Sequence, residues 1–204
     1  MIRFVLIFLF TLTCYANPLF KMKDLWNTNF FKSDRLKLEI AVGAMEYGLD
    51  PLIMIAQAYA ESSFNPKAIN LTERNYPSRG LFQIQFPTAW QQCKLSKRQL
   101  MNPLWNIRCA FIVHNNSRED FEGDEFEVIK MLFAYNAGGY YICNKRHHRK
   151  GIDCQLGYPV NYDYLIKIID HYVRLQPSFN RLRLTQFKSV NFLDLAQKYV
   201  DSLQ

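Results

Sequence analysis

One stretch, residues 50–66, constrains the fold more than any other part of the chain. Asp50 is a favourable N-cap, and Pro51 suits the first turn of a helix, where its missing N–H costs nothing. The side chains that follow are apolar on every side, which predicts a helix buried within a helical fold. Pro66 excludes continuation of this helix, so Glu61 lies near its C-terminal end.

The predicted position of Glu61 has chemical consequences. The negative end of the helix dipole and the apolar neighbours both disfavour the ionised carboxylate, so both are expected to raise its pKa. A carboxyl that stays protonated near neutral pH is what a general acid requires. The ordinary alternative is a solvated glutamate at the end of a surface helix, and the motifs described below favour the catalytic interpretation.

The first 16 residues have the pattern of a secretory signal peptide. Arg3 supplies a basic start, residues 4–10 are apolar, and Cys14-Tyr15-Ala16 places small residues at the two positions that define cleavage. We therefore expect export, cleavage after Ala16 and a periplasmic or secreted location. We expect no stable membrane span after cleavage, because the apolar run is too short to cross a bilayer.

Charge and cysteine content fit an exported protein. The formal net charge is +7, which falls by one when Arg3 leaves with the signal. A basic exported protein is attracted to anionic polymers such as the bacterial wall, and no nucleic-acid-binding motif accompanies the basic residues, so we expect no nucleic-acid partner. Four cysteines remain, an even number that predicts two disulfides in an exported chain. These four are Cys93, Cys109, Cys143 and Cys154, and their spacing leaves three pairings open. The sequential pairing, Cys93 with Cys109 and Cys143 with Cys154, closes short loops.

A zinc site is a chemically distinct alternative for the basic segment between the last two cysteines. Its candidate ligands are Cys143, His147, His148 and Cys154. Their spacing matches no familiar zinc finger, and export favours oxidised cysteines over thiolate ligands. We therefore expect no metal and no cofactor.

Helical periodicity predicts a mainly α fold with little or no β structure. At 204 residues the chain suits one domain. We divide it into a signal peptide (1–16), an N-terminal extension (17–32), a helical domain (33–176) and a C-terminal helical extension (177–204). Residues 80–85 fit either a short strand or an extended turn. Besides the first helix described, helices are predicted from Ser33 to Gly48, from Pro87, from Asn102, from Asp124 to Asn136, from 162 until Pro177 ends it, and near 191–203.

Three short motifs occur in a fixed order along the chain. They are Glu-Ser-Ser-Phe-Asn-Pro-Lys-Ala at 61–68, Ser-Arg-Gly-Leu-Phe-Gln-Ile at 78–84 and Ala-Tyr-Asn-Ala-Gly at 134–138. Together they resemble the lysozyme-like lytic transglycosylases of the soluble-transglycosylase type, over roughly residues 34–173. Within that group the chain is most similar to small exported members that accompany type III and type IV secretion systems and pili. The resemblance implies a lysozyme-like helical domain with a glycan-binding groove.

The resemblance also implies roles for individual residues. Glu61 would be the single catalytic carboxyl of a peptidoglycan lytic transglycosylase. It would protonate the oxygen between N-acetylmuramic acid (MurNAc) and N-acetylglucosamine (GlcNAc), then accept the proton of the muramoyl C6 hydroxyl, giving 1,6-anhydroMurNAc ends without water. The Tyr135 hydroxyl is expected to reach Glu61. The implied substrate-binding residues are Ser62, Ser78, Gln83, Ile84, Tyr135 and Asn136.

The chain departs from the family pattern at a few positions. Phe82 stands where Met is usual, and Arg79 stands where a small or acidic residue is frequent. Arg108-Cys109 replaces an expected Gly, so we expect that helix to be tied by a disulfide.

Two other functions use the same fold. A hydrolytic muramidase would need a second carboxyl about 5–10 Å from the first, for which the candidates are Glu73, Asp120, Glu122 and Asp124. None of these lies in a matching motif. The other function is that of a non-catalytic wall-binding or assembly protein. The presence of Glu61, Gln83 and Tyr135 argues against it, because such a protein would not need them. We expect the partners to be peptidoglycan glycan strands and components of a secretion system or pilus, and we expect a monomer.

Overall fold

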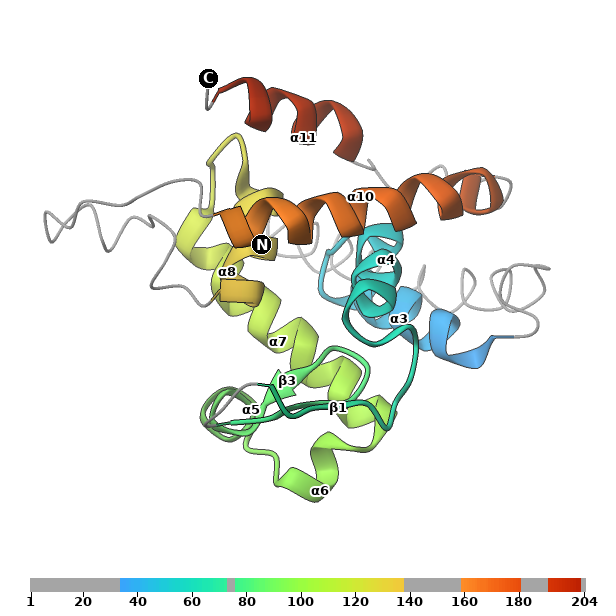
Figure 1. Ribbon diagram of the computed structural model, residues 1–204, viewed down its shortest axis with the longest axis vertical. Helices are drawn as coiled ribbons and strands as arrows, with labels where there is room; N and C mark the ends of the chain where they lie inside the picture. The colour runs from blue at the N-terminus through green and yellow to red at the C-terminus, as the bar shows by residue number, and fades with distance from the viewer. Residues whose placement is uncertain (1–33, 73–75, 138–158, 181–190, 203–204) are drawn as a thin grey trace, which may run out of the picture.

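A computed structural model describes residues 34–72, 76–137, 159–180 and 191–202 (Figure 1). Several predictions fall outside the described residues: the signal peptide, the N-terminal extension, the role of Glu73, and the basic segment with Cys143, Cys154 and its two histidines. The described chain is mainly helical, as the sequence predicted. Its eight helices are α3 (Arg35–Glu46), α4 (Pro51–Ser62), α5 (Phe86–Cys93), α6 (Lys97–Leu100), α7 (Pro103–Phe121), α8 (Glu127–Ala137), α10 (Pro159–Asn180) and α11 (Phe192–Asp201).

Helix α4 is the buried centre of the fold, and it packs against α3 and α10. All of residues 51–58 are buried. The Asp50 carboxylate caps the helix by accepting hydrogen bonds from the backbone N–H groups of Leu52 and Ile53, at 2.8 and 3.1 Å. The helix ends where Ser63 adopts a left-handed conformation with φ of 53°. The prediction of a capped, buried helix is therefore confirmed.

Three two-residue strands form a small antiparallel sheet in the order β1-β2-β3. They are β1 (Ile69–Asn70), β2 (Ser78–Arg79) and β3 (Ile84–Gln85). Figure 1 shows the strands together with α5 and α6 at one end of the long helix α7, and α8, α10 and α11 towards its other end. Helix α7 thus joins two parts of the fold, and the motif at 78–84 lies in the strand-containing part.

Several helix boundaries differ from the sequence predictions. Helix α3 is capped by Asp34, whose side chain accepts from the Lys37 N–H at 3.3 Å, one residue after the predicted cap. The prediction that Pro177 ends the last long helix was wrong, because α10 continues to Asn180. Pro177 lies in the final turn, where Leu175 and Phe179 pack against the core and hold the helical path.

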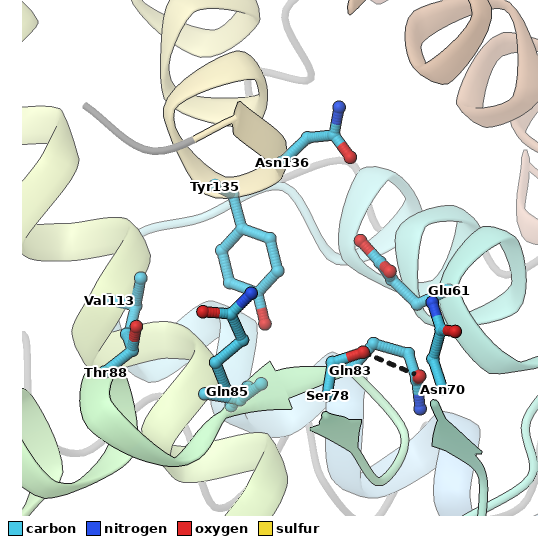
Figure 2. Close-up of a pocket in the computed structure, with 10 residues that line it drawn as sticks. Glu61, Asn70, Ser78, Gln83, Gln85, Thr88, Val113, Tyr135 and Asn136 are labelled. Carbon is cyan, nitrogen blue, oxygen red and sulfur yellow. Dashed lines mark hydrogen bonds between the residues drawn. The ribbon is translucent and has the colours of Figure 1, made fainter. Parts of the chain in front are cut away.

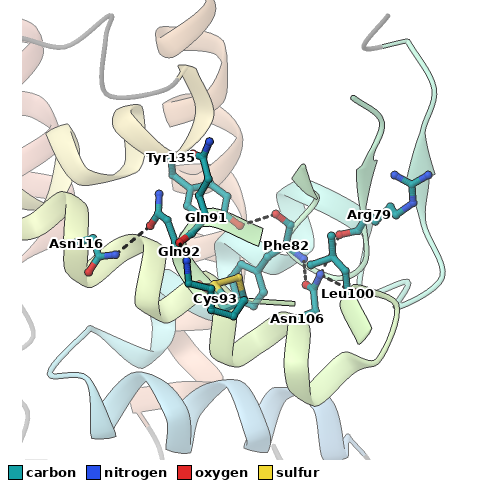
Figure 3. The surroundings of a disulfide bond; sticks show 11 residues. Arg79, Phe82, Gln91, Gln92, Cys93, Leu100, Asn106, Asn116 and Tyr135 are labelled. Carbon is teal, nitrogen blue, oxygen red and sulfur yellow. Dashed lines mark hydrogen bonds between the residues drawn. A yellow bond between two sulfur atoms is a disulfide. The ribbon is translucent and has the colours of Figure 1, made fainter. Parts of the chain in front are cut away.

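A disulfide between Cys93 and Cys109 joins the end of α5 to α7, with 5.5 Å between the two Cα atoms (Figure 3). This confirms the pairing predicted for these two cysteines and the prediction that a disulfide ties the helix containing Cys109. Within the described ranges, no helix combines the length and apolarity needed to span a membrane.

Candidate active site

A polar cleft of about 470 Å³ lies between the two parts of the fold (Figure 2). Amides and hydroxyls dominate its wall, and Glu61 is the only carboxyl among the described residues that line it. Six of the predicted site residues share this cleft although they come from α4, β2, the β2–β3 connection, β3 and α8. The lining residues are Glu61, Asn70, Ser78, Gln83, Ile84, Gln85, Thr88, Val113, Tyr135 and Asn136.

Glu61 projects from the last turn of α4 and is half-buried. The Tyr164 hydroxyl of α10 donates a hydrogen bond of 2.6 Å to Glu61 Oε1. The Gln57 side chain, one turn earlier on α4, donates from Nε2 to the Tyr164 hydroxyl oxygen at 2.9 Å. These contacts place Glu61 at the end of a buried chain of hydrogen bonds that reaches into the core.

Tyr135 faces the same cleft but does not hold Glu61 as the resemblance implied. Its hydroxyl donates to the Phe82 backbone carbonyl at 2.7 Å, so the hydroxyl that bonds Glu61 is that of Tyr164. The Tyr135 ring stacks on His114, with 4.4 Å between ring centroids and 14° between planes. Burial, and then the charge of Glu61, raises the pKa of both Tyr135 and Tyr164 well above the usual value. Both hydroxyls therefore keep their protons.

Ser62 does not line the cleft. Its hydroxyl donates to the Leu81 carbonyl at 2.8 Å and to the Ala58 carbonyl at 3.2 Å. The first bond ties the end of α4 to the second motif, and the second lies within the helix. The contacts of Ser62 thus hold the Glu61 helix against the neighbouring turn.

The second motif is a turn that is fastened by its own side chains. Ser78 is buried, and its hydroxyl donates to Gln83 Oε1 at 3.0 Å. Gln83 Nε2 donates to the Gly80 carbonyl at 2.8 Å and to the Ala68 carbonyl at 3.3 Å. Gln83 also adopts a left-handed conformation, with φ of 46°. Its amide shapes the wall of the cleft by holding the Ser78–Gln83 turn closed.

Asn106 of α7 supports this turn from below (Figure 3). The fully buried side chain accepts from the Phe82 N–H at 2.8 Å and donates to the carbonyls of Arg79 and Leu100 at 2.9 and 3.1 Å. Gly80 has φ of 78°, and a Cβ there would lie 2.3 Å from Asn106 Nδ2. The glycine of the motif is therefore required both by its conformation and by the close approach of Asn106.

Sequence reasoning missed Tyr164, Gln57 and Asn106. A polar Gln57 inside an otherwise apolar run was the one signal available for this group, because a buried amide needs a partner. Tyr164 is one of several aromatic residues along an amphipathic helix, and nothing in that pattern distinguishes it. Asn106 follows an N-cap and a proline, as an ordinary first-turn residue would.

The candidates for a second acid do not line the cleft in the described part of the chain. Glu73 lies outside the described residues. Asp120 and Glu122 lie at the C-terminal end of α7, and Asp124 pairs with Lys130 at 2.5 Å. The described ranges also contain no group of three side chains arranged to hold a metal ion.

The family model described as the transglycosylase SLT domain matches residues 40–153, which is more than half of the chain. The chain belongs to the transglycosylase SLT domain family, whose lytic-transglycosylase-type domains act on peptidoglycan. The matched range contains Glu61, the Ser78–Gln83 turn and Tyr135. Comparison with curated proteins finds no match.

Proposed function

We propose that the protein is a lytic transglycosylase that cleaves the MurNAc-β-1,4-GlcNAc bond of peptidoglycan without hydrolysis, with Glu61 as its catalytic carboxyl. The observation that carries the proposal is the cleft, in which Glu61 is the one carboxyl among the described lining residues. A hydrolytic glycosidase generally uses two carboxyls, one as the acid and one as the base or nucleophile. A single carboxyl suffices when the substrate's own groups replace water.

The proposed reaction moves one proton in a cycle. Glu61 donates its proton to the glycosidic oxygen as the bond from that oxygen to the muramoyl C1 breaks, and the GlcNAc end leaves as an alcohol. The muramoyl C6 oxygen then bonds to C1, and its proton passes to the Glu61 carboxylate. The carboxyl ends protonated as it began, and no water is consumed. General acid and base catalysis by one positioned group typically contributes about 10²–10⁴-fold to the rate.

The surroundings of Glu61 support both steps. Tyr164 donates a hydrogen bond to Oε1, which stabilises the carboxylate formed after the first proton transfer. The amide side chains of Asn70, Gln85 and Asn136 line the same cleft. Amides can both donate and accept, which suits the hydroxyl and N-acetyl groups of a glycan.

The proposal is tested by digesting purified peptidoglycan and analysing the soluble products by mass spectrometry. Wild type should release anhydro-muropeptides, and Glu61→Gln should release at least about 10²-fold less because it cannot supply the proton. Glu46→Gln, at an exposed position of α3, is the matched control and should behave as wild type. Reducing ends in place of anhydro ends would instead indicate a hydrolytic muramidase.

We also propose that the mature chain begins after Ala16 and acts as a monomer in the periplasm or outside the cell, at a secretion or pilus apparatus. The signal pattern and the similarity in sequence to small exported transglycosylases support this placement. N-terminal sequencing of the exported protein should find Asn17 first. An uncleaved N-terminus in the cytoplasmic fraction would contradict the proposal.

A further inference from the structure

Gln57 is the exception in an otherwise apolar buried segment. Residues 51–58 of α4 are all buried, and Gln57 is the only one of them with a polar side chain. The exposed fraction of Gln57 is 0%, and Gln57 is not among the residues that line the cleft. Burying an amide is unfavourable unless a hydrogen bond compensates, so a glutamine at this position needs a physical reason.

The contacts of Gln57 lead directly to Glu61. Gln57 Nε2 donates to the Tyr164 hydroxyl oxygen, and that hydroxyl donates to Glu61 Oε1, at 2.9 and 2.6 Å. A tyrosine hydroxyl carries one proton. An amide N–H can only donate, so Tyr164 accepts from Gln57 and its proton remains available for Glu61. Gln57 and Glu61 are four residues apart, on the same face of α4, so that one tyrosine from α10 can contact both.

From this geometry we infer that Gln57 is a positioning residue for the proposed acid: it directs the Tyr164 hydroxyl onto Glu61 and thereby favours the ionised form of that carboxyl. A hydroxyl that accepts a hydrogen bond is polarised and becomes a better donor. A carboxylate that accepts a stronger hydrogen bond is stabilised relative to its protonated form. The inference rests on the proposed role of Glu61.

Of the titratable side chains around the cleft, Tyr164 is the one with hydrogen bonds to both Gln57 and Glu61 among the described residues. The charge of Glu61 acts on Tyr135 from α8 and on Tyr164 from α10, and both of these side chains stay protonated. His114 of α7 lies behind Tyr135 and stacks on its ring. His171 of α10 contacts the Tyr59 ring, with centroids 4.1 Å apart. Tyr164 is therefore the group through which Gln57 influences Glu61.

The test is the pH dependence of kcat/KM for Gln57→Met, which removes the amide and keeps a long buried side chain. A general acid must be protonated in the free enzyme, so kcat/KM falls as pH rises through the pKa of Glu61. Loss of the polarising amide should raise this pKa. The high-pH fall of kcat/KM, the upper limb of the profile, should therefore move to higher pH by about 0.5–1 unit. Met54→Leu, a volume-conserving core change in the same helix, should leave the limb where it is in wild type.

A double-mutant cycle separates positioning from packing. Tyr164→Phe should move the upper limb at least as far as Gln57→Met, and the double variant should move it no further than Tyr164→Phe alone, because Gln57 acts through that hydroxyl. If Gln57→Met does not fold, Gln57→Leu replaces it in the cycle. Two results would overturn the inference. One is a pH profile of Gln57→Met that matches wild type, and the other is a double variant whose upper limb moves by the sum of the two single shifts. Failure of wild type itself to release anhydro products would instead overturn the proposed function.

Discussion

Replacement of Asn106 by alanine should destabilise the protein by about 3–6 kcal/mol. The side chain makes three hydrogen bonds, to the Phe82 N–H and to the carbonyls of Arg79 and Leu100. Each buried polar group that loses its partner costs about 1–3 kcal/mol, and partial relaxation of the turn keeps the total below the simple maximum. Domains are stable by only about 5–15 kcal/mol, so the predicted loss is a large fraction of the whole.

Urea unfolding followed by circular dichroism measures this loss. The matched control is Asn116→Ala on the same helix, where the exposed side chain makes one hydrogen bond, to Gln92 Oε1 at 3.1 Å. That control should stay within about 0.5 kcal/mol of wild type. Asn106→Asp should be at least as damaging as Asn106→Ala near neutral pH, because a carboxylate cannot donate to two carbonyl oxygens. An Asn106→Ala protein within about 1 kcal/mol of wild type would refute the view that Asn106 supports the Ser78–Gln83 turn.

Two further predictions concern stability. Replacing Cys93 and Cys109 together by serine should lower the free energy of unfolding by about 3 kcal/mol, the value expected for a disulfide closing a loop of this length, and an unchanged urea midpoint would contradict it. Burial lowers the pKa of His114 to about 3, from 6.5, so its contribution to stability is complete above pH 6.5 and is lost as pH falls from 6.5 towards 3. The loss should reach about 3 kcal/mol near pH 4.5, and His114→Phe should remove it. Equal pH dependence in both proteins would exclude His114 as its source.

Local chemistry made α4 and its ends predictable. Asp50 before Pro51 is a strong N-terminal signal, and the apolar run indicated burial without knowledge of the neighbours. The same local logic correctly placed the Asn102 cap of α7 and the glycine at the end of α3. The disulfide followed from the even number of cysteines left in a chain predicted to be exported, although spacing alone left its pairing open.

Contacts between distant residues could not be predicted in this way. Tyr164 lies 103 residues from Glu61 in the chain, and only the packing of α10 against α4 brings them together. The resemblance correctly brought Tyr135 to the cleft but assigned its hydroxyl to the wrong partner, because the Phe82 carbonyl competes for the same proton. Pro177 is a case in which a local signal gave the wrong prediction. Proline predicted the end of the helix, but the core contacts of Leu175 and Phe179 accompany a helix that continues to Asn180.

The most direct test of the proposed chemistry is digestion of peptidoglycan in water enriched in heavy oxygen. Mass spectrometry would then show whether the new muramoyl ends contain an oxygen atom from water. The account predicts unlabelled 1,6-anhydro ends, each lighter than a reducing end by one water molecule, because the muramoyl C6 oxygen takes the place of water. New reducing ends that carry the heavy isotope would show that water attacks C1, and would contradict a single-carboxyl, non-hydrolytic mechanism at Glu61.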